Sequence, residues 1–404
     1  MRKMLITLAA LTASAPLAAL EIDPHVPPEI VVGGRALGTV DLESEQRRER
    51  GRDTDSGVNI EDTSLLFGLS KYLHDDAHYG FGAFGLKALG DSEINDSVFL
   101  HQAFGGVGGD RWEVRIGRTN LPNMLLRFPT IRDDDLLRYT HVPNARLEGE
   151  SDTLTLYGEQ LAADWYFTPL FVGSVAATAR PEGEPASADY ASFNGGAISL
   201  RYYVPETVDV ARGLTFAGVL VDFQDLDRRA GERDGNLVAL TGALGFNLTG
   251  NPEALMHLDT QVIWTDGESV TGLDTPLARA RTDSLAGVAS LRYRHRPYLQ
   301  QRWQAALTVA GRDYRDFSGA RSYAIAPSMA WRLGNGVDLM TQVVHERYDG
   351  DAARGIGLDH ESRIQVGVSF VFDHTFNPSV GRRDDILRLE HDMLWPGPGS
   401  PGGH

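Results

Sequence analysis

The stretch SRIQVGVSFVF, residues 362–372, decides the fold. Its even-numbered positions from Ile364 to Phe372 are apolar, whereas Arg363, Gln365 and Ser369 stand between them. Successive side chains of a β-strand point to opposite faces of the sheet. The stretch therefore predicts a strand with one apolar face and one polar face.

The same alternation recurs along most of the chain. Residues 284–294, 302–312 and 322–333 repeat it clearly, with arginines on the polar face. Weaker copies lie at 29–42, 62–73, 78–89, 96–107, 111–118, 152–160, 162–179, 190–204, 213–224, 236–248, 255–265 and 336–348. Strands of about ten residues that alternate in this way are typical of transmembrane β-barrels. The sequence predicts an all-β, antiparallel up-and-down barrel of about sixteen strands, to within about two.

The arginines indicate which face of each strand meets lipid. An Arg side chain that faces lipid near the middle of the bilayer costs about 2 to 4 kcal/mol. Arg302, Arg312 and Arg363 share the polar faces of their strands. We therefore expect these three side chains to line a water-filled lumen.

The connections between predicted strands alternate in length. Long gaps such as 43–61, 119–151 and 180–189 alternate with short ones, such as 74–77 and a single residue at Leu161. Transmembrane barrels join their strands by short periplasmic turns and longer external loops. This alternation supports the strand count, because one miscounted strand would invert every later gap.

Both ends of the chain lie outside the predicted barrel of residues 20–372. Residues 1–19 hold Arg2 and Lys3, then an apolar run and small residues, which is typical of a secretory signal peptide. Residues 373–404 form a C-terminal extension. We expect a solvated periplasmic tail, with a segment that plugs the inner mouth or docks a partner as the alternative.

Composition limits the other classes of protein. Loss of the signal peptide removes two of the 38 Lys and Arg residues and leaves 36 against 55 Asp and Glu, a net charge of −19; nucleic acid is therefore not an expected partner. Cysteine is absent, which excludes disulfides, thiolate metal sites and a cysteine nucleophile. We expect no cofactor. No mature segment approaches the roughly 20 apolar residues of a transmembrane helix, so a membrane-spanning chain must be a closed barrel.

Residues 119–151 interrupt the strand pattern. They include Pro122, Pro129 and Pro143, many charged residues and no alternating apolar run. Loops longer than about 12 to 15 residues are usually functional or disordered. We expect this segment to fold into the lumen and narrow it.

Three stretches resemble the Gram-negative general diffusion porins of the sixteen-stranded type. VFLHQAF at 98–104 and WEVRIGR at 112–118 are similar to the pattern that leads into the third external loop of that family. VGVSFVF at 366–372 is similar to its aromatic-ended last strand. The resemblance implies a barrel in the outer membrane of a Gram-negative bacterium, with an inward-folded third external loop, which here is 119–151.

The resemblance also implies a function and partners. Porins pass small hydrophilic solutes and ions by passive diffusion, lie among outer-membrane lipid and lipopolysaccharide, are inserted by the barrel assembly machinery and form homotrimers. Members of the family usually end at the terminal aromatic residue, whereas this chain continues past Phe372.

Candidate site residues follow from the same resemblance, because acidic residues on the inward loop of porins face basic residues on the wall. The candidates for the constriction are Asp133, Asp134, Asp135, Arg35, Arg115 and Arg118, and those for the remaining lumen lining are Arg302, Arg312 and Arg363. Arg118 is carried over from the Gly-Arg motif, although its strand parity is ambiguous. Each residue could equally be an ordinary solvated lumen residue. We expect no metal site, since three adjacent acids project in different directions.

Two other functions were weighed. A closed or plugged barrel that serves adhesion, assembly or partner docking remains an alternative. A barrel hydrolase would need Ser and His together on the outer wall with an orienting Asn or Asp, or carboxylates and His at the rim. His345, Glu346, Asp359 and His360 fall near the predicted rim, but no Ser–His motif stands out, so we expect no enzyme.

The acidic balance of the chain predicts a mild preference for cations, because the charges that line a pore select ions. The arginines of the wall act in the opposite direction. A reversal potential measured across a bilayer with a salt gradient is expected to have the sign of a cation-preferring pore. A potential of the opposite sign would contradict the prediction.

Overall fold

The structure is a computed structural model of the chain. It describes residues 27–47, 51–60, 62–73, 78–88, 98–132, 135–142, 156–179, 193–204, 212–226, 235–249, 251, 253–267, 283–295, 303–315, 319–334, 336–350, 352–353 and 358–376. The predicted signal peptide and the extension after Phe376 lie outside the described residues.

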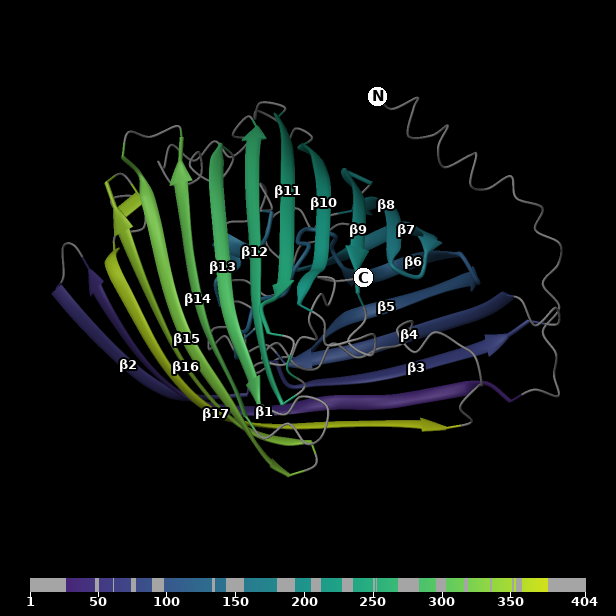
Figure 1. Cartoon of the computed structure of the whole chain (residues 1–404), viewed down its shortest axis with the longest axis horizontal. Coiled ribbons are helices and arrows are strands. Elements are labelled where there is room, and N and C mark those ends of the chain that lie inside the picture. The colour runs from purple at the N-terminus through teal and green to yellow at the C-terminus, as the bar shows by residue number, and fades with distance from the viewer. Residues whose placement is uncertain are drawn as a thin grey trace.

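The strands form one closed antiparallel barrel (Figure 1). In chain order they are β1 (Glu29–Arg47), β2 (Gly51–Asn59), β3 (Ser64–Tyr72), β4 (His78–Ala88), β5 (Val98–Gly109), β6 (Trp112–Asn120), β7 (Tyr157–Thr168), β8 (Phe171–Ala179), β9 (Gly195–Tyr203), β10 (Gly213–Leu226), β11 (Gly235–Asn247), β12 (Ala254–Gly267), β13 (Ser284–His295), β14 (Trp303–Tyr314), β15 (Arg321–Gly334), β16 (Val337–Asp349) and β17 (Leu358–Phe376). The barrel closes where β1 pairs with β17, with Val40 opposite Val366. Closure leaves the wall without an unpaired edge, as a membrane-spanning sheet requires.

Two strands share one place in the wall. β3 pairs with β1 along Glu29–Arg35, whereas β2 pairs with β1 along Thr39–Arg47. The seventeen described strands therefore occupy sixteen positions, and the predicted barrel is confirmed. The predicted loop at 43–61 was wrong in part, because it is mostly a β1–β2 hairpin that projects from the barrel (Figure 1).

Two further boundaries differ from the prediction. The expected turn at Leu161 was wrong, because this residue lies inside β7 and the chain reverses at Pro169 and Leu170. The last strand continues four residues beyond Phe372 and ends at Phe376.

The two ends of the barrel have connections of different length. At one end, here called the short-turn end, the strands are joined by short connections such as Asp110–Arg111. The opposite end is here called the long-loop end.

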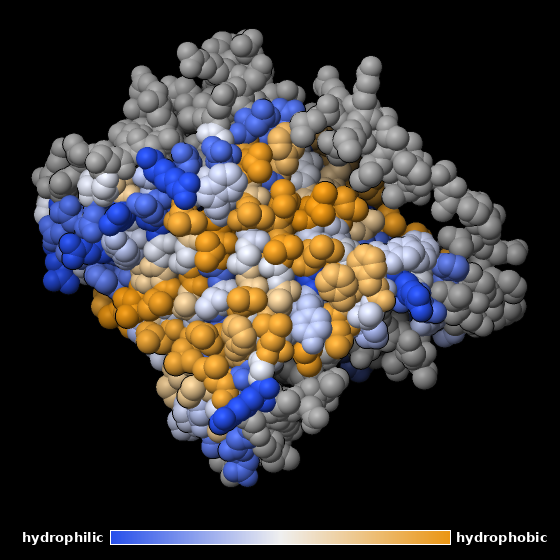
Figure 2. Space-filling view, turned by 45° about the horizontal axis from the view of Figure 1, so that its top comes forward, coloured by the Kyte–Doolittle hydropathy of each residue, from blue (hydrophilic) through white to orange (hydrophobic). Residues whose placement is uncertain are grey.

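The two faces of the wall differ as the alternation predicts. On β17, Val366 is 47% exposed whereas its neighbour Gln365 is 0% exposed. On β14, Leu307 is 44% exposed and Thr308 is 0% exposed. Figure 2 shows apolar side chains as a broad belt between more hydrophilic margins. Because the polar and charged side chains point inward, the outer surface suits lipid.

The helix α2 (Leu137–Thr140) follows β6 in the chain. Within the described ranges, no helix is long and apolar enough to cross a membrane.

The apolar belt gives a test on a single strand. Ile325 and Leu333 both face outward on β15, but Leu333 lies near the strand end. Leu333→Arg is expected to lower the free energy of unfolding in lipid vesicles by about 0 to 1 kcal/mol, and Ile325→Arg by more, up to the roughly 2 to 4 kcal/mol of the bilayer midplane, because the cost of a charge depends on its depth. Equal losses in a denaturant titration would contradict the placement of the belt.

Candidate functional site

Residues 121–132 and 135–142, here called the inner segment, leave the end of β6 and contact the inner face of the wall. Most of their side chains are buried; Leu121, Leu125 and Ile131 are at most 1% exposed. Their partners come from β1 and from strands between β9 and β17. A buried loop must find partners for its backbone polar groups, and the wall supplies them.

Gln261 on β12 joins the two arms of the inner segment. Its Oε1 accepts hydrogen bonds from the backbone N–H groups of Leu125, at 2.9 Å, and Leu126, at 3.0 Å. Its Nε2 donates to the carbonyl oxygen of Thr140 at 2.7 Å. One amide therefore satisfies three backbone groups that would otherwise be buried without partners.

Gln342 on β16 acts in the same way further along the segment. Its Oε1 accepts from the N–H of Ile131 at 2.6 Å, and its Nε2 donates to Asp135 Oδ2 at 3.3 Å. Arg363 on β17 approaches the other oxygen of Asp135 at 3.0 Å and also Glu43 at 2.6 Å. Asp135, a candidate for the constriction, is 6% exposed and is bound to the wall.

Two predicted basic residues also bind the segment through its carbonyl oxygens. Arg35 on β1 donates to the Ile131 carbonyl at 3.3 Å and to Ser369 Oγ at 3.2 Å. Arg312 on β14 donates to the Arg138 carbonyl at 2.6 Å. These carbonyl oxygens therefore have charge-assisted partners, which are stronger than neutral ones.

Helix α2 is held against β16 by a small polar cluster. Glu346 accepts a hydrogen bond from Tyr139 Oη at 3.3 Å and lies 3.4 Å from Arg138 Nε. The Arg138 guanidinium also lies over the ring of Tyr348, 4.9 Å from its centroid. Burial, with the nearby Glu346 carboxylate, raises the pKa of Tyr139 well above its usual value, so this phenol stays a hydrogen-bond donor.

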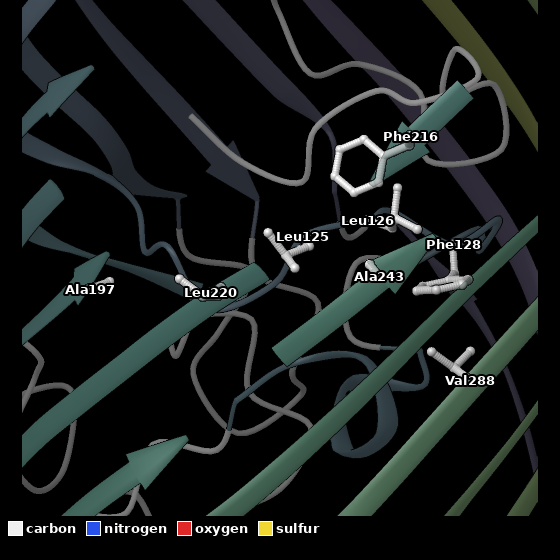
Figure 3. Packing of buried hydrophobic residues seen from close by; sticks show 8 residues of the cluster. All are labelled: Leu125, Leu126, Phe128, Ala197, Phe216, Leu220, Ala243 and Val288. Carbon is white, nitrogen blue, oxygen red and sulfur yellow. The ribbon is translucent and has the colours of Figure 1, made fainter. Parts of the chain in front are cut away.

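Apolar side chains of the segment pack against apolar residues of the inner wall (Figure 3). Leu125, Leu126 and Phe128 form a buried cluster with wall residues of the four strands β9, β10, β11 and β13. Small wall residues make room for the segment, and the ones in these clusters are Ala197, Ala239, Ala243, Ala286, Ala324, Ala326 and Ala330. An inner wall of larger polar side chains would leave no space for this packing.

The segment also reaches the opposite wall. Leu137 packs with Leu156 and with Tyr157 at the start of β7, while Leu136 and Tyr139 pack with residues of β15 and β16. β7 and β15 lie on opposite sides of a barrel with sixteen positions. The described part of the segment therefore extends across the lumen. Leu136 has φ 62°, a left-handed conformation that is costly for this residue and that its buried side chain holds in place.

A second charged cluster lies on the wall of β6 to β9. Arg115 contacts Asp164 at 2.7 Å and Glu113 at 3.6 Å. Arg201 lies 3.7 Å from the same Asp164 and donates to Ser174 Oγ at 2.7 Å. The cluster borders a pocket whose other side is formed by the start of the inner segment.

The remaining predicted residues divide into two groups. Arg118 shares the outward parity of Ile116, which is 61% exposed, and pairs with the exposed Glu159 at 3.2 Å; the structure thus places it on the outer face, away from the lumen. Asp133, Asp134 and Arg302 lie outside the described residues. Over the ranges that are described, no group of three or more His, Asp or Glu side chains could hold a metal ion.

The sequence did not predict the anchoring role of Gln261 and Gln342, nor that of Glu346, which was noted only as a residue near the rim. Each occupies an inward position of a predicted strand, so its direction could be read from the alternation. The partner of each anchoring side chain could not be predicted, because no strand pattern determines the path of residues 119–151. The run of inward alanines was the available signal, since a solvated wall does not require small residues.

The sequence also did not predict a Ser–His pair on the outer face. His345 Nδ1 lies 2.8 Å from Ser362 Oγ, on neighbouring strands near the long-loop end. His360 stands beside them, with ring centroids 5.9 Å apart from His345. A Ser–His pair is two thirds of a nucleophilic triad, and no contact among the described residues joins a carboxylate to this imidazole.

The barrel is similar to solved outer-membrane channels. The outer membrane channel DcaP of Acinetobacter baumannii aligns with a TM-score of 0.60 at 11% identity, over 87% of this chain and 99% of that one. An anion-selective porin from Comamonas acidovorans aligns at 0.57 and 13%, over 86% and 100%. OprB of Pseudomonas putida aligns at 0.55 and 10%, over 85% and 94%. Identities this low show the fold, and the fold is that of a porin. No protein-family model matches the chain, and no curated protein matches its sequence.

The two glutamines should control the mobility of the inner segment. Gln261→Ala leaves the N–H groups of Leu125 and Leu126 buried without acceptors, at a cost of about 1 to 3 kcal/mol. Amide hydrogen exchange at these two residues is expected to become about tenfold faster or more. Gln342→Ala should have the same effect at Ile131.

Gln365→Ala is the matched control. Gln365 is an inward glutamine that is 0% exposed, and neither of its amide atoms has a hydrogen-bond partner among the described residues. The exchange rates of the segment should therefore be unchanged. Equally faster hydrogen exchange in all three variants would mean that any cavity in the wall loosens the segment. The hydrogen bonds of Gln261 and Gln342 would then not be what holds it.

Proposed function

We propose that the protein is an outer-membrane porin that passes small hydrophilic solutes and ions by diffusion. Its site of selection is the passage left between the inner segment and the wall of β3 to β8. Lipid and lipopolysaccharide surround the apolar belt, and the mouth with long loops faces the outside. The observation that carries the proposal is a closed wall with apolar side chains outside and polar ones inside.

The contacts of the inner segment support a fixed constriction. Asp135, Arg35, Arg312 and Arg363 serve as anchors that hold the segment on one part of the wall. A rigid constriction selects solutes by diameter without the need for a moving gate. In this proposal these four residues anchor the segment, and other charged residues select the solutes.

The cluster around Arg115 is the better candidate for a lining of the passage. Arg115 and Arg201 face Glu113 and Asp164 beside the pocket that Pro122 and Met124 close from the other side. Opposite charges at such close quarters create a strong local field. In this proposal the field orients polar solutes as they pass the start of the segment.

One observation favours the closed barrel as a second candidate. Inward side chains of the wall are scarcely exposed, even below the inner segment: Arg292 is 2% exposed, Thr308 0% and Asp338 1%. Side chains that line a wide, water-filled lumen would be more exposed than this. A narrow or filled lumen is therefore compatible with a protein that docks a partner and conducts nothing.

Conductance separates the two functions. The full chain, folded and reconstituted into planar lipid bilayers, is expected to give steady single-channel steps. The fold should first be checked by its resistance to denaturation in detergent without heating. Silence from correctly folded protein in repeated reconstitutions would rule out the channel.

A variant with a shortened segment gives the matched control. Replacement of residues 124–141 by a short Gly-Ser linker removes the obstruction and leaves every strand intact. A porin should then conduct several-fold more than the full chain. Silence in the full chain together with steps in the variant would instead identify the segment as a plug.

A further inference from the structure

The pocket beside the charged cluster of β6 to β9 has a polar side on the wall. Glu113, Asp164, Ser174 and Ser199 stand in one row across these four strands, because each pairs with the next in the sheet. Side chains in such positions start about 5 Å apart. Asp164 and the two serines line the pocket, so a carboxylate and two hydroxyl groups face its interior together.

Another part of the lining is apolar. Met124 and Leu125 of the inner segment line the pocket, together with Leu220 of β10. Leu125 and Leu220 are each 1% exposed and belong to the cluster shown in Figure 3. The pocket therefore offers polar partners to one end of a solute and apolar side chains to the other.

Arg201 has a donor that the described part of the protein leaves without a partner. The side chain is 5% exposed and lines the pocket. Its Nη2 donates to Ser174 Oγ at 2.7 Å, but its buried Nε has no hydrogen-bond acceptor among the described residues. Buried polar groups are nearly always paired. The Nε–H group therefore indicates an acceptor that binds from the pocket.

The charges around Arg201 limit what this acceptor can be. A carboxylate matches a guanidinium group, whose planar fork of donors fits its two oxygens. A solute with a carboxylate alone, however, is repelled by Asp164, which lies 3.7 Å from Arg201. An ammonium group on the same solute offsets this repulsion, because an ionised carboxylate accepts about four hydrogen bonds and Asp164 can be shared with Arg115. With Glu113 the cluster holds two arginines and two acids, so a solute without net charge keeps it balanced.

We propose that the pocket binds an α-amino acid with an aliphatic side chain. The carboxylate of the amino acid accepts hydrogen bonds from Arg201 Nε and from the hydroxyl group of Ser199. Its ammonium group donates to Asp164. Its side chain packs against Met124 and Leu125, so that each end of the solute meets lining of its own kind.

The position of the pocket gives this binding a function in transport. Its cover begins at Pro122, two residues after β6 ends at Asn120, so the pocket borders the passage proposed between the inner segment and the wall. A site in a channel must bind its solute well enough to admit it and weakly enough to release it. Passage of the amino acid through the lumen rests on the proposed channel, but binding itself does not.

Equilibrium binding tests the proposal without any need for conduction. The full chain in detergent micelles is titrated with leucine, 4-methylpentanoate and 3-methylbutylamine, and binding is followed by ligand-observed NMR. The second compound is leucine without its ammonium group, and the third is leucine without its carboxylate. Leucine should bind at least about tenfold more tightly than either, because each analogue loses charge-assisted hydrogen bonds. Equal affinities, or tighter binding of 4-methylpentanoate, would overturn the proposal.

Variants separate a ligand site from a structural cluster. Arg201→Gln should weaken the binding of leucine and of 4-methylpentanoate about tenfold without weakening that of 3-methylbutylamine, because only a carboxylate contacts the guanidinium group. Equal loss for all three compounds would identify a structural arginine and overturn the proposal. Ser199→Ala is a smaller change to the wall and should weaken leucine binding several-fold, so it tests the site even if Arg201→Gln does not fold.

Arg332→Gln is the matched control. Arg332 also pairs with an acidic residue of the neighbouring strand, Asp338, but it does not line the pocket. Its leucine affinity should be unchanged. A loss equal to that of Arg201→Gln would mean that removal of any such arginine disturbs the wall, and would overturn the assignment of Arg201.

The two proposals can fail separately. Silent bilayers with intact leucine binding would remove the channel and leave the site. Steady conductance with no preference for leucine over its two analogues would remove the site and leave the channel.

Discussion

The absence of water in the bilayer core is the constraint on which this structure depends. Every backbone N–H and C=O group in that layer must be paired within the protein, and β1 meets this demand by pairing with β17 on one side and with β2 and β3 on the other. Once the sheet is closed, each strand has one face in lipid and one in the lumen. Within the apolar belt the inward face is then favoured for arginine, and the polar positions of the strands become the lining.

A lining of this kind creates a second demand when part of the chain enters it. The inner segment lacks regular structure apart from α2, so its backbone groups must be paired by side chains. Gln261 and Gln342 answer this demand because an amide both donates and accepts. Arg35 and Arg312 can only donate, and they bind carbonyl oxygens. The inward-facing Arg35 and Arg312 therefore bind the inner segment instead of water.

The alternating pattern predicted the strands because positions that face lipid are apolar and positions that face the lumen are polar. It failed where other forces act. It placed a break between two strands at Leu161, although this residue lies inside β7. β2 is exposed on both faces and therefore has no alternation to detect.

The candidate site was predictable only in part, for a related reason. Parity gave the inward direction of Arg35, Arg115, Arg312 and Arg363, and their burial agrees with it. Whether an inward arginine meets a solute, a carboxylate or a backbone carbonyl depends on the route of a loop that has no periodic pattern. Residue spacing predicts which face of a strand each side chain occupies, but it does not predict where a long loop lies.

The pairing of inward charges also limits what the overall charge of the chain can do. Arg115 and Arg201 stand against Glu113 and Asp164, and Arg292 stands against Asp259. These groups are locally neutral, so their fields fall off within a few ångströms. The acidic surplus of the chain therefore acts mainly at the mouths, where salt screens it over about 10 Å.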